Sequence, residues 1–183
     1  MIESTVEVVK SAISQHLNRN SQVEGGGYKG QTLYLFFRLL AVCHTVVVDK
    51  DPKTGEVVYQ ASSPDELALI EGAKQVGFVL LERTQKLMKI FNELSDKVEE
   101  YEIIREFPFD SDRKRMTLIV KHEGRYLLMT KGADSVMIPR IVHQTAKSAQ
   151  RVKKELTRFA TEGLRTLVVC QRDLSRLDCE ALD

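Results

Sequence analysis

The spacing of hydrophobic residues changes along the chain at Gly77. Before this glycine, apolar positions recur about every 3.6 residues in three segments, which predicts helices over 5–18, 33–44 and 64–76. Two β-branched runs within 45–61 flank a turn that contains Asp, Pro and Gly, and they predict a β-hairpin. The first part of the chain is therefore expected to be mostly helical, with one hairpin.

The third of these helices carries the clearest boundary residues. Ser63 is the expected N-cap, and Pro64 occupies the first helical position, where its missing N–H costs nothing. Asp65 and Glu66 follow and complement the positive end of the helix dipole. Gly77 ends the helix, so this segment is defined by its local chemistry at both ends.

After Gly77 the apolar period falls to about two residues, which is typical of strands. Helical spacing returns at 152–163, and one more strand is expected over 164–174. Strands joined by short turns must be antiparallel, because parallel neighbours need long crossovers. The predicted fold is α+β: a mostly antiparallel sheet of about six or seven strands flanked by helices. The five consecutive strands are expected over 78–83, 87–91, 98–107, 116–122 and 125–130.

The segment 18–30 contains three consecutive glycines, which raises the question of a phosphate-binding loop. No strand precedes them and no GK[ST] follows, so the segment is interpreted as a flexible linker. The predicted organisation is an N-terminal helix and linker over 1–30, a main domain over 31–174 and a C-terminal tail over 175–183.

Composition narrows the functional classes. The 183 residues carry 27 basic and 26 acidic side chains, a net charge of +1, which argues against a general polyanion binder. The three cysteines lack CxxC spacing and the four histidines are scattered, so neither a disulfide framework nor a structural zinc is expected. The most apolar stretch is interrupted by Arg38 and His44 and is too short to span a bilayer.

The stretch FPFDSDRKRM, residues 107–116, places two aromatic rings beside three cations. It can be a strand that ends in a solvated basic turn, or a site for a flat, negatively charged ligand such as a nucleotide or a nucleic acid. The two rings would share one face of a regular strand, but Pro108 and the following turn break that regularity. The two rings therefore need not point the same way, and Phe107 is expected in the core.

Four stretches, in order, resemble a known family: 59–74 with SPDE, 107–120 with FDSDRKRM, 130–137 with KGAD and 162–169 with EGLRT. Together they resemble the nucleotide-binding domain of P-type ATPases. The residues within these motifs are similar to those of the P4 class, the phospholipid flippases. The DKTGT and GDGxND motifs of the family are absent from the chain. The resemblance therefore implies one domain of a larger pump.

The resemblance also implies roles for single residues. Adenine would stack on Phe109, Lys131 would lie deep in the ATP pocket, Arg165 would contact phosphates, and Glu66 would lie near the adenine amino group. Stacking on a π-face and bidentate binding by a guanidinium are suited to these ligands. The full set of expected ATP contacts is Glu66, Phe109, Lys131, Arg165, Gly132, Lys114, Asp65 and Ser111.

The implied activity is that of a pump component. The domain would bind ATP with Mg²⁺, whose ligands are expected outside this chain, and present the γ-phosphate to an Asp of another domain to drive lipid flipping. No catalytic residue and no metal ligand is expected here, so the chain alone should bind ATP without hydrolysing it.

The resemblance also implies partners and a location. The partners would be the phosphorylation and actuator domains, a membrane reached through segments outside this chain, and an accessory subunit in some pumps. The chain would be a cytosolic domain of an integral membrane protein, and nucleic acid is not expected to bind. The alternatives left open are the nucleotide-binding domain of another P-type class, and a nucleic-acid-binding or interaction module.

Overall fold

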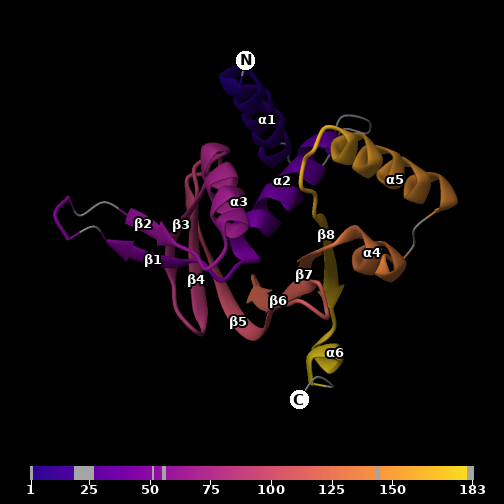
Figure 1. Ribbon diagram of the computed structural model, residues 1–183. Coiled ribbons are helices and arrows are strands. Elements are labelled where there is room, and N and C mark those ends of the chain that lie inside the picture. The colour runs from indigo at the N-terminus through magenta and orange to yellow at the C-terminus, as the bar shows by residue number, and fades with distance from the viewer. Residues whose placement is uncertain (1, 19–26, 51, 55–56, 143–144, 181–183) are drawn as a thin grey trace.

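The computed structural model describes residues 2–18, 27–50, 52–54, 57–142 and 145–180 (Figure 1). Its main feature is a six-stranded antiparallel sheet in the order β3-β4-β5-β6-β7-β8, accompanied by a two-stranded sheet of β1 and β2. Every sheet neighbour is also a sequence neighbour; β3 to β7 are joined by short connections, whereas α4, η1 and α5 lie between β7 and β8. The predicted α+β fold is confirmed.

The strands and helices have the following bounds. The strands are β1 (Val47–Lys50), β2 (Val57–Gln60), β3 (Phe78–Arg83), β4 (Leu87–Asn92), β5 (Lys97–Asp110), β6 (Arg115–His122), β7 (Arg125–Gly132) and β8 (Val168–Leu174). The helices are α1 (Ile2–Leu17), α2 (Gly27–Val42), α3 (Pro64–Gln75), α4 (Asp134–Met137), the 3-10 turn η1 (Ile138–Arg140), α5 (Ala146–Thr161) and α6 (Arg176–Glu180).

The core lies between one face of the sheet and the helices α2 and α3, which contact β3 (Figure 1). Alternation along the strands points one set of side chains at these helices, and burial of that apolar set stabilises the layered arrangement. Helix α1 contributes Ile13, which is fully buried. The largest fully buried side chains include Tyr101, Phe78, Leu39, Ile70, Leu80, Met88, Ile90 and Leu118.

Helix α2 begins earlier than its hydrophobic pattern predicts, at Gly27 rather than at residue 33. The reason is a long-range contact with α1. A Cβ added at Gly30 would lie 2.4 Å from the carbonyl oxygen of Ala12, so the absent side chain lets the two helices approach closely. Of the linker predicted over 18–30, residues 19–26 lie outside the described part of the chain.

The C-terminal third also differs in detail from the sequence prediction. Helix α5 begins at Ala146, six residues before the predicted start, because Thr145 and Ser148 form a reciprocal capping box. Strand β8 begins only at Val168, and the short elements α4, η1 and α6 were not predicted. The division into 1–30, 31–174 and 175–183 stays a prediction. Within the described residues, no helix combines the length and the apolar character needed to span a bilayer.

Candidate functional site

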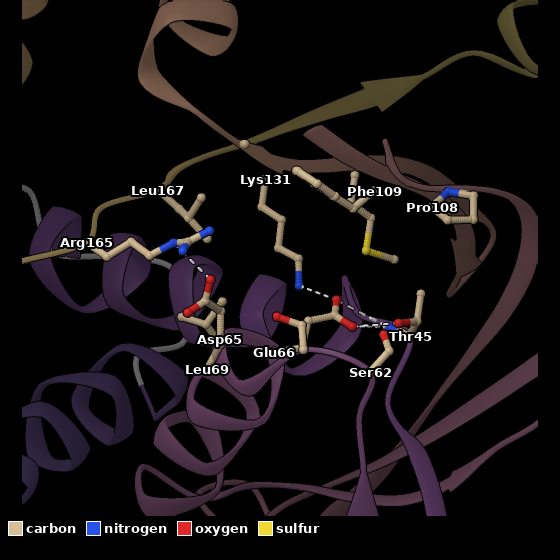
Figure 2. A pocket seen from close by; sticks show the side chains of 13 residues that line it. Thr45, Ser62, Asp65, Glu66, Leu69, Pro108, Phe109, Lys131, Arg165 and Leu167 are labelled. Atoms are coloured by element: carbon tan, nitrogen blue, oxygen red, sulfur yellow. Dashed lines mark hydrogen bonds and ion pairs between the residues drawn. The ribbon is translucent and has the colours of Figure 1, made fainter. Parts of the chain in front are cut away.

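A cavity of about 430 Å³ opens between the N-terminal turn of α3, the end of β5, the strands β6 and β7, and the segment before β8 (Figure 2). Segments far apart in the sequence meet here, since residues 45–69, 108–116, 131–132 and 165–167 all contribute to the lining. The cavity is lined by Thr45, Ser62, Ser63, Asp65, Glu66, Leu69, Pro108, Phe109, Met116, Lys131, Gly132, Arg165 and Leu167.

An ion pair occupies the inner part of this cavity. The Nζ of Lys131, near the end of β7, lies 2.7 Å from Oε1 of Glu66 in the first turn of α3 (Figure 2). The Lys131 side chain is only 7% exposed and that of Glu66 only 12%. Thr45 adds a hydrogen bond of 2.5 Å from its hydroxyl to Oε2 of Glu66, and its backbone N–H points at the same carboxylate. The buried charges are thus paired, as burial requires.

This arrangement sets the protonation state of Glu66. Burial by itself would raise the pKa of the carboxyl group, but hydrogen bonds from Lys131 and Thr45 favour the charged form more strongly. The pKa of Glu66 is therefore lowered below its ordinary value of 4.5. Glu66 is therefore a carboxylate at neutral pH.

A second ion pair lies at the rim. Nε of Arg165, in the segment before β8, lies 2.9 Å from Oδ2 of Asp65 on α3. This pair is open to solvent, since the Arg165 side chain is 79% exposed and that of Asp65 41%. An exposed pair of this kind contributes little to stability and can exchange partners at low cost.

The aromatic side of the cavity is formed by Phe109, which is 64% exposed. An irregularity in the β5–β6 ladder places Phe107 opposite Thr117 but Asp110 opposite Arg115, so Pro108 and Phe109 together face only one residue of β6. This β-bulge changes the alternation, and Phe109 lines the cavity while Phe107 does not.

The expectation of a core position for Phe107 is wrong. The ring is half-buried and outside the core cluster, and the guanidinium of Arg113 lies 5.5 Å from its centroid. A cation over an aromatic face is a favourable contact at a surface. The two rings of the FPFDSDRKRM stretch therefore lie in different places: Phe109 lines the cavity, and Phe107 contacts Arg113 at the surface.

Gly132 brings β7 close to the turn before β6. A Cβ at this position would lie 2.6 Å from Cβ of Arg115 and 2.7 Å from the carbonyl oxygen of Lys114. The absence of a side chain at the KGAD glycine is thus needed for the strands to pair at the cavity wall.

Six of the eight residues expected from the sequence line this cavity: Glu66, Phe109, Lys131, Arg165, Gly132 and Asp65. Lys114 and Ser111 are exposed in the turn between β5 and β6 and are not among its lining residues. The expected role of each of the eight in binding ATP stays a prediction.

Sequence reasoning missed Thr45, Ser62, Ser63, Leu69, Pro108 and Leu167 as lining residues. Ser63 was identified only as a helix cap, and Thr45 carries no local signal, because its contact with Glu66 depends on how the hairpin packs beside α3. Within the described ranges, no group of three His, Cys, Asp or Glu side chains is arranged to hold a metal ion.

Comparison with known proteins gives one consistent result. A model of the P-type ATPase cytoplasmic domain N matches residues 32–181. The chain is 43% identical over 160 residues to phospholipid-transporting ATPase IC of Xenopus tropicalis, covering 87% of this chain and 12% of that protein. It is 34% identical over 203 residues to phospholipid-transporting ATPase IG of Homo sapiens, covering 100% of this chain and 18% of that protein.

A third relative is probable phospholipid-transporting ATPase 11 of Arabidopsis thaliana, with 43% identity over 148 residues, 78% of this chain and 12% of that protein. The chain therefore spans only a small part of the length of these relatives. The resemblance stated from the sequence motifs is confirmed, and the structure has a cavity where those motifs meet. The chain belongs to the P-type ATPase cytoplasmic domain N family.

Proposed function

We propose that this chain is the ATP-binding domain of a phospholipid-transporting P-type ATPase, and that ATP binds in the cavity between α3 and β7. The observation that carries the proposal is the meeting of an exposed aromatic ring, Phe109, with the cations Lys131 and Arg165 around one cavity. A nucleotide has the matching parts: a flat base and a chain of phosphates.

The adenine end of the site is assigned to Phe109 and Glu66. The exposed ring offers a stacking surface for the base. The Glu66 carboxylate already accepts from Lys131 and Thr45, but a carboxylate has about four acceptor positions, so room remains for the amino group of adenine. Guanine presents an acceptor at that position and would be disfavoured.

The phosphate end is assigned to Arg165. Its guanidinium is held by Asp65 at the solvent-exposed rim, and a phosphate can replace this carboxylate as the partner. Lys131 is held deeper by Glu66, which places its ammonium toward the base end of the bound nucleotide. Gly132, the next residue, lines the cavity wall without adding a side chain.

The chain's own residues bind and orient the nucleotide, and the chemistry follows in the rest of the pump. The γ-phosphate would be presented to an Asp of the phosphorylation domain, which attacks in line and forms an aspartyl-phosphate. Mg²⁺ would accompany ATP and reduce the repulsion between phosphates and nucleophile, with ligands from that other domain. Hydrolysis of the aspartyl-phosphate would drive lipid transport through membrane segments outside this chain.

The remaining parts of this proposal concern the setting of the domain. The actuator domain and, in some pumps, an accessory subunit are proposed as further partners. The domain is proposed to lie in the cytosol, attached to an integral membrane protein. This domain would then contribute by positioning ATP, whereas the bonds would be broken and formed in the other domain.

A titration of the chain with ATP, followed by backbone amide shifts, tests the proposal. We expect saturable shifts at Glu66, Phe109, Lys131 and Arg165, with weaker binding of GTP. No saturable shift at these four residues would refute the ATP site. Tight, steeply salt-dependent binding of an oligonucleotide would instead support a nucleic-acid-binding module.

A further inference from the structure

A second cavity, of about 540 Å³, lies on the opposite face of the β6–β7 pair. Met116 and Lys131 are paired across these strands and line the first cavity. Their neighbours Thr117 and Thr130 are also paired, and they line the second. Because successive side chains of a strand point to opposite faces, the same two strands form a wall of both cavities.

Three arginines surround this second cavity: Arg115 on β6, Arg140 on η1 and Arg172 on β8. None of them has a carboxylate within 4.0 Å among the described residues, unlike Arg165 in the first cavity. Arg115 and Arg140 each donate from Nη1 to a backbone carbonyl, which leaves most of their N–H groups free. The chain has a net charge of only +1, so three neighbouring cations that form no ion pair among the described residues are an unusual concentration.

The charges at this cavity repel one another. The pKa of Arg115 is lowered first by partial burial and then by the positive charges of Arg140 and Arg113. Asp178 attracts Arg172 electrostatically, but its carboxylate already accepts from the backbone N–H and the hydroxyl of Ser175, both at 2.8 Å. A bound anion would relieve the repulsion that remains, because no carboxylate of the described residues lies within 4.0 Å of the three arginines.

The floor of the cavity provides a further donor. The hydroxyl oxygens of Thr117 and Thr130 lie 3.0 Å apart, and both residues are buried. Two hydroxyl groups carry two protons, and their mutual hydrogen bond uses one, so the second can be donated to a ligand. The walls between the polar groups are apolar, with Leu128, Met137 and Ile141.

We propose that this second cavity binds a phosphate monoester that carries an apolar group. Guanidinium groups bind phosphate oxygens bidentately. Three guanidinium groups suit a phosphate dianion better than they suit a ligand with a single carboxylate. The threonine hydroxyl supplies one more hydrogen bond, and Leu128, Met137 and Ile141 cover the apolar part. The site is separate from the proposed ATP cavity, since the two lie on opposite faces of the sheet.

Amide-shift titrations with four probes test this proposal on the whole chain. Phenyl phosphate represents a phosphorylated aromatic side chain, and dihexanoyl phosphatidic acid represents a lipid headgroup. Inorganic phosphate and phenol present the charge and the ring separately. We expect at least one of the two monoesters to bind at least tenfold more tightly than inorganic phosphate or phenol, with shifts at Thr117, Thr130 and Cys170. The tighter monoester identifies the source of the phosphate.

Variants separate this site from general charge effects. Arg140→Gln and Arg172→Gln change exposed side chains, so the fold should persist, and each should weaken the tighter monoester about tenfold or more. Arg151→Gln on α5 is the matched control, because it removes an exposed positive charge away from the cavity. ATP affinity should remain unchanged in all three variants, so failure of this site and failure of the ATP site are distinguishable.

Three results would overturn the proposal. The first is monoester binding no tighter than that of inorganic phosphate. The second is equal weakening by Arg151→Gln, which would indicate general attraction by a basic surface. The third is a set of shifts confined to Glu66, Phe109 and Lys131, which would place the probe in the first cavity.

Discussion

Replacement of Phe109 by alanine separates a binding role from a packing role. Phe109 is 64% exposed, so folding covers only about a third of the side chain. Full burial of a Phe side chain contributes about 1.5–3 kcal/mol, so its loss here should lower the free energy of unfolding by only about 0.5–1 kcal/mol. A core phenylalanine would cost about 3–5 kcal/mol.

The same substitution should have a larger effect on ATP. Stacking of a base on an aromatic ring contributes about 1–3 kcal/mol, which corresponds to about 5–150-fold in the dissociation constant. Calorimetric titration with ATP measures this loss, and urea unfolding of the same variant measures the stability. The ratio of the two effects, rather than either alone, identifies the role of the ring.

Phe107→Ala is the matched control. It removes the same side chain two residues away on β5, but Phe107 does not line the cavity and contacts Arg113 instead. ATP affinity should be unchanged in this variant. A Phe109→Ala protein that loses 3 kcal/mol or more of stability and binds ATP normally would refute the assignment of Phe109 to the site.

Four further predictions follow from the geometry. Lys131→Met should lower the free energy of unfolding in urea by about 3–5 kcal/mol, because it leaves the buried carboxylate of Glu66 without its cation. Adding Glu66→Gln should recover part of the loss. An unchanged unfolding midpoint for Lys131→Met would contradict this prediction. Because folding lowers the pKa of Glu66, the contribution of its carboxylate to the free energy of unfolding should be fully present above the ordinary value of 4.5 and lost as the pH falls through the lowered pKa. In Glu66→Gln the free energy of unfolding should therefore fall less steeply with decreasing pH in this range. An unchanged pH dependence would exclude Glu66 as its source. Gly30→Ala should lower the melting temperature and cost about 1–3 kcal/mol of the free energy of unfolding, because the new Cβ would clash with the carbonyl oxygen of Ala12. Gly72→Ala in α3 should raise the melting temperature, because a Cβ there meets no atom within 4 Å and alanine favours the helix. The purified chain should release phosphate from ATP only at background rate, and turnover that persists through repurification and disappears in Arg165→Ala would show otherwise.

The sequence alone determined the strands and the longer helices, and their order. The change of apolar period after Gly77 and the short connections required an antiparallel sheet, because these patterns follow from backbone geometry within a few residues. The start of α3 follows from Pro64 and the acids behind it, and its end from Gly77, in the same local way. The order of the motifs also pointed to the family and to six of the thirteen residues that line the cavity.

Only the tertiary structure decided how those side chains pair. Lys131 and Glu66 are 65 residues apart, and their ion pair exists because the fold brings the first turn of α3 within side-chain reach of the end of β7. The bulge that directs Phe109 into the cavity depends on the register between β5 and β6, which the sequence of either strand does not reveal. The early start of α2 depends on a contact between Gly30 and Ala12. Such features depend on long-range packing, which overrides local preference wherever two segments meet closely.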